Sequence, residues 1–251
     1  MALVAFALAM ILSQELVLLD WKPAAFLFVS GMIGLCLGDI FLFKAYTTLG
    51  AGRSLVLFSF EPLFLGIYGY FFLNQLFSVN QTLAVICMVI CVYIFMLERS
   101  HTTGSWDLRS FFWAFTGICF DAFGVMLTRS AYEMSPYLET FQVNVIRCLG
   151  AIFAFLLIRP KGILEVMKGI RELTTKEKMV VTGAAIGGCF ISLTLYLAAL
   201  KHAHVGTLTA ISITGPVWVS LLECLYHRQW PNRYLVGAFV FFLTGFAMMI
   251  Q

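Results

Sequence analysis

The sequence predicts an all-α protein that crosses a membrane about nine times. Of its 251 residues, 61% are hydrophobic and only 12% are charged, which is far outside the range of soluble globular proteins. The apolar residues are grouped into runs of about 20, the length that a helix needs to cross the hydrocarbon core. Part of the chain also matches another part at a fixed spacing. Together these observations predict a polytopic membrane protein with an internal repeat.

Charged or turn-rich breaks divide the chain into nine apolar runs, and we expect each run to be a spanning helix. The longest break, residues 159 to 178, has room for a short amphipathic helix at the membrane surface. We expect no soluble domain, and we place the protein in a cell membrane, inner or plasma, as a multi-pass protein. The predicted spans cover residues 2 to 19, 24 to 47, 53 to 73, 81 to 97, 108 to 130, 139 to 158, 178 to 201, 205 to 225 and 232 to 250.

Charge and cysteine usage argue against several other classes of protein. The net charge is only +3 and the basic residues lie between apolar runs, so we expect no nucleic-acid partner. The seven cysteines lie inside apolar runs without a C-x-x-C or Cys/His spacing, so we expect neither a metal nor another cofactor. The first run could be a signal peptide, but it lacks a basic n-region, and Glu15 and Asp20 occupy the place of a cleavage site. We therefore expect a retained helix.

An internal repeat appears when the chain is shifted by 154 residues, because three consecutive predicted helices then match three others in order. The alternative is coincidence between apolar runs. If the repeat is real, residues 1 to 100 hold four helices and residues 105 to 251 hold five, so we expect the first helix of the first repeat to be missing before Met1. The shift aligns Pro62 with Pro216, Gln75 with Gln229, Gly34 with Gly188, Ala45 with Ala199 and Gly52 with Gly206.

The repeated stretch resembles the EamA-type repeat of the drug/metabolite transporter superfamily. Residues 34 to 75 read GLCLGDIFLFKAYTTLGAGRSLVLFSFEPLFLGIYGYFFLNQ, a Gly-rich helix, an aromatic-x-Ala element, a turn, and a Pro followed by a Gly- and aromatic-rich helix. Residues 187 to 249 look like a second copy. The resemblance implies ten helices in two inverted repeats and a transporter rather than an enzyme. Gln75 and Gln229 stand where the family commonly has Glu.

Two carboxylates fall at the same predicted depth in neighbouring helices. Asp39 lies eight residues before Thr47 and Glu61 eight residues after Arg53, so both should lie about 12 Å deep. Charged side chains at such a depth cost about 2.5 to 3.5 kcal/mol and by default mark a pathway or a partner. At least one carboxylate should hold its proton near neutral pH unless Lys44 reaches them, as a proton-coupling site requires. Alternatively, both only hydrogen-bond freed backbone and fix helix contacts.

Two prolines are expected to kink the central helix of each repeat. Pro62 and Pro216 each remove an N–H and displace a carbonyl near the middle of a span. Freed backbone at that depth persists only where it is buried in protein or lines a cavity. Tyr68 and Trp218, which follow the prolines, could line a pocket for an amphipathic or aromatic solute. The alternative is that the prolines merely bend packed helices.

Two further sets of residues are expected to hold helices together. Asp121 lies eight residues before Arg129, and Arg147 lies eight residues after Glu139, so Asp121 and Arg147 should meet as a structural ion pair inside the membrane. Small residues permit close helix approach, namely Gly31, Gly34 and Gly38 on one helix and Gly183 and Gly187 on its repeat mate.

The function that these features favour is transport of a small metabolite by alternating access between two repeats. The solute could be amino-acid-like, drug-like or another organic compound, and we expect an exporter coupled to protons or to exchange. Its partners are then the small-molecule substrate and the lipid bilayer, with a homodimer as one possible assembly. A non-transporting scaffold or subunit is the first alternative. A membrane-embedded enzyme is the weakest, because no metal-ligand cluster, acidic pair or nucleophile–base pair stands at helix spacing.

Overall fold

The structure is a computed structural model, and it describes residues 19 to 49, 108 to 202 and 233 to 250, with isolated positions between 54 and 97 and position 225. All regular elements of the described residues are helices. Four of these helices are long and apolar enough to cross a membrane, which confirms a helical multi-pass protein; they are Trp21–Leu49, Leu108–Met134, Thr140–Ile158 and Thr175–His202.

The four spans end within four residues of the predicted boundaries. A fifth helix, α14 (Arg233–Ile250), coincides with the last predicted span to within one residue. The predicted spans at 2 to 19 and 205 to 225 lie outside the described residues, apart from single positions, and those at 53 to 73 and 81 to 97 are described only at isolated positions. The count of nine and the inverted arrangement of the repeats stay predictions.

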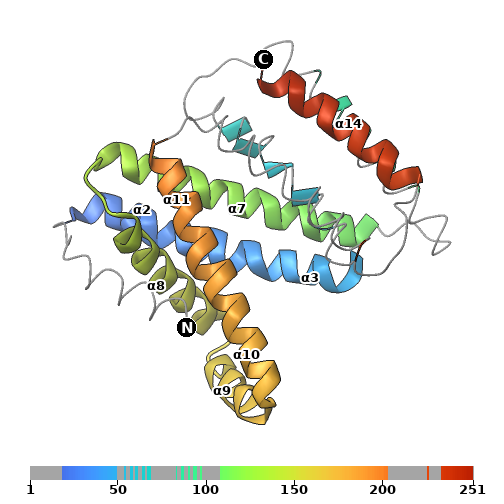
Figure 1. Cartoon of the computed structure of the whole chain (residues 1–251). Helices are drawn as coiled ribbons and strands as arrows, with labels where there is room; N and C mark the ends of the chain where they lie inside the picture. Colours follow the sequence, from blue (N-terminus) through green and yellow to red (C-terminus); the bar gives the residue numbers. More distant parts are fainter. Residues whose placement is uncertain are drawn as a thin grey trace. The chain divides into compact units, whose positions relative to one another are not determined.

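Two of the spans have a π-helical middle. The first span runs through α2 (Trp21–Ser30), η1 (Gly31–Gly38) and α3 (Asp39–Leu49), and the second through α10 (Thr175–Ala184), η2 (Ala185–Ser192) and α11 (Leu193–His202). Figure 1 shows each as one continuous rod, the first in blue and the second in orange. Corresponding segments of the two spans begin 154 residues apart, the spacing of the sequence repeat. In these two helices the repeat therefore extends to the backbone hydrogen bonding.

The chain divides into two compact units, and the first comprises Met1–Leu37 and Phe123–Ala203. In this unit α8 (Thr140–Ile158) packs against α2 and α11. A Cβ atom added to Gly31 would collide with the backbone carbonyl of Arg147, and one added to Gly150 would collide with that of Phe28. The two helix backbones thus lie in direct contact, the close approach that the glycine spacing predicts.

The second unit comprises Gly38–Ala122 and His204–Gln251. Its described helices are α3, α14 and the first part of α7 (Leu108–Met134). A Cβ atom added to Gly117 of α7 would lie 2.9 Å from the side chain of Leu42, so α7 also approaches α3 closely. The apolar core of this unit consists of Leu42, Ala45, Leu49, Leu57, Phe60, Phe111, Ala114, Ile118, Ala238 and Phe242.

The glycines of the second π-containing span are in a different environment. No atom of the described residues lies within 4 Å of a Cβ atom added to Gly183, Gly187 or Gly188. In the most apolar stretch of this span 6% of the residues are buried, compared with 39% in that of its repeat mate. Within the described part of the chain, the packing role predicted for Gly183 and Gly187 is therefore not seen, whereas that of Gly31 is.

Candidate functional site

Glu61 is a buried carboxylate. It is 4% exposed, and its neighbour Phe60 is 1% exposed. The amide of Phe60 donates to the carbonyl oxygen of Leu57 at 2.9 Å, an i→i−3 bond, so a tight turn lies directly before Glu61. Leu57, Glu61 and Phe64 are four and three residues apart and share one helix face, and the Phe64 ring lies 6.4 Å from that of Phe115 in α7. The carboxylate thus belongs to the face that packs on α7.

Tyr68 lies on the same face as Glu61, seven residues further along. Its hydroxyl donates to the carbonyl oxygen of Cys119 in α7 at 3.1 Å and lies 2.9 Å from the Cys119 sulfur. The predicted site residue Tyr68 is therefore fixed against α7 by its polar end. Its ring remains half-buried.

Asp39 is the first residue of α3, where the π-helical segment gives way to an ordinary α-helix. Its side chain is half-buried. Lys44 is the one cation of α3 that could neutralise the Asp39 carboxylate. Its Nζ atom lies 4.0 Å from the centre of the Trp113 ring. A cation over an indole face is stabilised by the ring quadrupole. The repeat mate of Asp39 is Leu193, so the second copy lacks this carboxylate as well as that of Glu61.

The first unit contains buried polar side chains that charge-based sequence reasoning missed. The Ser30 and Thr128 hydroxyls lie 2.7 Å apart, and each is 2.9 Å from the carbonyl oxygen of Gly124. Asn144 on α8 is fully buried, and neither its Oδ1 nor its Nδ2 atom has a hydrogen-bond partner in the structure as described. A buried polar atom without a partner costs about 1 to 3 kcal/mol, so an asparagine in this state is a candidate for binding water or a ligand.

Arg147 lies one helical turn after Asn144 and is 1% exposed. Its predicted partner, Asp121, is half-buried on α7. A guanidinium held this deep needs a compensating charge or several acceptors. The two residues belong to different units, and their ion pair stays a prediction.

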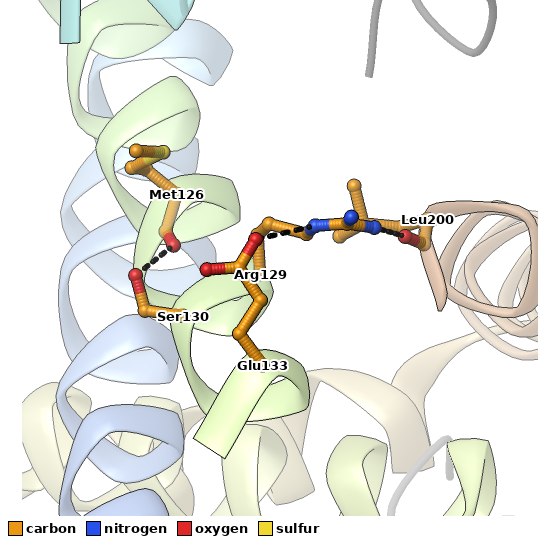
Figure 2. Close-up of polar contacts among 5 residues, drawn as sticks. All are labelled: Met126, Arg129, Ser130, Glu133 and Leu200. Carbon is orange, nitrogen blue, oxygen red and sulfur yellow. Dashed lines mark hydrogen bonds and ion pairs between the residues drawn. The ribbon is translucent and has the colours of Figure 1, made fainter. Parts of the chain in front are cut away.

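A polar clamp, formed by Arg129, Glu133 and the Leu200 carbonyl, connects α7 to the end of α11. Figure 2 shows Arg129 reaching from α7 to that carbonyl oxygen, to which its Nη1 atom donates at 2.6 Å. The Nε atom of Arg129 is 3.1 Å from Glu133 on the same helix. The predicted span ends at residue 130, one residue after Arg129, whereas α7 continues to Met134.

Three of the predicted site residues, Pro62, Pro216 and Trp218, lie outside the described residues. The candidate site therefore consists of Asp39, Glu61 and Tyr68, all in the second unit, and Asn144 is a separate candidate in the first unit. Among the residues that the structure describes, no group of three or more His, Cys, Asp or Glu side chains could hold a metal ion.

Comparison with known proteins relates the chain to membrane transporters. The family model of EamA-like transporters matches residues 1–97 and 108–251. A solved structure described only as "Crystal structure of protein" matches with a TM-score of 0.70 and 16% sequence identity, covering 98% of this chain and 84% of the other. At that identity the likeness concerns the fold. No curated protein matches the chain. Since the family model covers nearly the whole sequence, the chain belongs to the EamA-like transporter family.

Proposed function

We propose that the protein moves a small organic solute across a cell membrane, inner or plasma, by alternating access. Glu61 either binds a cationic group of the solute or carries the coupling proton. The observation that supports this role is the burial of the Glu61 carboxylate, 4% exposed, on a helix face that also carries Leu57, Phe64 and Tyr68. An ionised carboxylate in such surroundings is costly, so its charge state should respond to a bound cation or to pH.

The asymmetry between the repeats also supports a site built mainly from the first copy. At the repeat spacing, Gly215 and Leu193 stand where the first copy has Glu61 and Asp39. The first repeat would then supply the carboxylates of the site, and the second repeat would leave space for the solute. We further propose export coupled to protons or to exchange, since a buried carboxylate can alternate between a proton and a cationic solute.

The test of this proposal replaces Glu61 with glutamine in the full chain. A thermal-shift screen against a metabolite library first identifies a solute, and proteoliposomes containing a pH-sensitive dye then report solute uptake and proton movement together. The Glu61→Gln variant keeps the size of the side chain and its hydrogen bonding but cannot titrate. We expect normal expression, with transport reduced at least about tenfold or no longer dependent on pH.

The matched control is Glu172→Gln, the same substitution at an exposed position outside the spans. It should transport like the unmodified protein. Unchanged rate and pH dependence in Glu61→Gln would show that Glu61 is structural. Absence of transport by the purified unmodified chain, with any solute of the screen, would favour the scaffold or subunit alternative.

A further inference from the structure

The helix α9 (Gly162–Glu172) has an apolar side that the described residues leave uncovered. It lies between α8, which ends at Ile158, and α10, which begins at Thr175. Val166, Met167 and Ile170 fall on one side of the helix at i, i+1 and i+4. They are 62%, 50% and 37% exposed.

The connections of α9 hold it close to the ends of two membrane spans. Three residues separate Ile158 from Gly162, and two separate Glu172 from Thr175. Since an extended chain covers at most about 3.6 Å per residue, the first residue of α9 lies within roughly 15 Å of the end of α8, and its last residue within roughly 11 Å of the start of α10. Thr174 and Glu177 form a capping box that starts α10 directly after this turn. Figure 1 shows α9 where the chain turns from α8 into α10.

The residues around this turn are predominantly basic. Between residues 159 and 178 six basic side chains stand against three acidic ones, and all nine are exposed. One basic group is used internally, because Arg159 Nη2 lies 2.7 Å from Glu165 Oε2. The remaining excess of positive charge faces outward. The basic residues are Arg159, Lys161, Lys168, Arg171, Lys176 and Lys178, and the acidic ones are Glu165, Glu172 and Glu177.

We propose that α9 lies in the headgroup layer of the bilayer, with Val166, Met167 and Ile170 against the acyl chains and the basic residues bound to anionic lipid headgroups. The apolar side excludes a fully solvated position, and the two adjoining spans exclude a position away from the membrane. A short amphipathic helix with lysine and arginine on its polar side has the chemistry that binds anionic bilayer surfaces. The inference rests on the spans and not on the proposed transport.

The experiment measures hydrogen exchange of the backbone amides of residues 164 to 172 in the full chain. The protein is placed in nanodiscs of phosphatidylcholine, either pure or with about a third of phosphatidylglycerol. We expect exchange at least about tenfold slower in the anionic nanodiscs than in the neutral ones. The double variant Lys168→Gln/Arg171→Gln keeps the apolar side and should lose most of this difference between lipids. Met167→Glu should lose protection from hydrogen exchange in both kinds of nanodisc.

The control variant Glu172→Gln, which adds no apolar surface and removes no basic group, should retain the dependence on anionic lipid. Two outcomes would overturn the proposal. One is the same exchange rate in both kinds of nanodisc. The other is protection that rises with protein concentration in lipid-free detergent, because a second copy of the chain would then cover α9.

Discussion

Asn144 combines full burial in a membrane span with two amide atoms that have no hydrogen-bond partner among the described residues. If these atoms bind nothing, the side chain weakens the protein, because each unpaired polar atom carries its desolvation cost. Asn144→Leu should then stabilise the solute-free protein by about 1 to 3 kcal/mol. If they bind the solute, the same variant should also lose at least about tenfold in affinity. Thermal unfolding with and without solute measures both effects.

The control for Asn144→Leu is Ile152→Leu, an apolar exchange at a half-exposed position of the same helix, which should change neither quantity. A variant at Asn144 that is less stable than the unmodified protein would contradict the prediction. It would mean that residues outside the described part of the chain form hydrogen bonds with the Asn144 amide.

Asp121 and Arg147 are predicted to form an ion pair inside the membrane. Arg147→Met or Asp121→Leu should each destabilise the protein by about 3 to 5 kcal/mol, because either change leaves one buried charge uncompensated. The double variant should cost clearly less than the sum of the two. Unfolding in a graded detergent mixture gives the four stabilities of the cycle. Additive losses would show that the two residues do not interact.

The sequence predicted the buried charges of the site better than its uncharged groups. Glu61 was placed deep in the membrane by counting residues from the end of its span, and it is buried. Asn144 and Ser30 were missed because their neighbours form ordinary apolar runs and neither carries a charge. The end of the span at residues 108 to 130 was placed one residue after Arg129, four residues too early, and the hydrogen bond from its guanidinium to the end of another helix was not predicted.

The helices themselves show where sequence patterns stop being informative. Hydropathy and charged breaks located four spans to within four residues, because the bilayer fixes their length. The π-helical segments Gly31–Gly38 and Ala185–Ser192 were not predicted. A change from i→i−4 to i→i−5 hydrogen bonding leaves composition unchanged, and a uniformly apolar helix has no polar face whose rotation would reveal it.

The two π-containing spans allow a tightly packed glycine, Gly31, to be compared with an exposed one, Gly187. Gly31→Ala should destabilise the protein by about 1 to 3 kcal/mol, because its Cβ atom would meet the Arg147 backbone, which cannot move without shifting α8. Gly187→Ala should be neutral or stabilising by up to about 1 kcal/mol, since no described atom lies within 4 Å and alanine favours the helix. Thermal unfolding of both variants measures the difference. Equal losses would show that residues outside the described part pack on Gly187.

At the scale of the whole molecule, a transporter must open one end of its helix bundle while the other stays closed. In the first unit the C-terminal end of α11 is held by two polar contacts. Arg129 of α7 donates to the Leu200 carbonyl at 2.6 Å, and Lys201 Nζ lies 3.8 Å from Glu139, the residue before α8. Both contacts lie at one end of three spans, α7, α8 and α11. In the alternating access that we propose, they would hold this end closed in one state.

Breaking the Arg129 contact should shift the protein towards the state in which this end is open. A hydrogen bond from a charged group contributes about 1.5 to 3 kcal/mol, so its loss should raise the open population roughly 10- to 150-fold where the closed state dominates. A cysteine at position 200, buried in the structure, should then react faster with a water-soluble thiol reagent in Arg129→Gln, in a background without other cysteines. Arg109→Gln removes a cation of the same helix that lies over Trp113 and should leave the rate unchanged. Equal labelling rates with and without Arg129 would show that this contact only fixes the helix end and does not hold a gate.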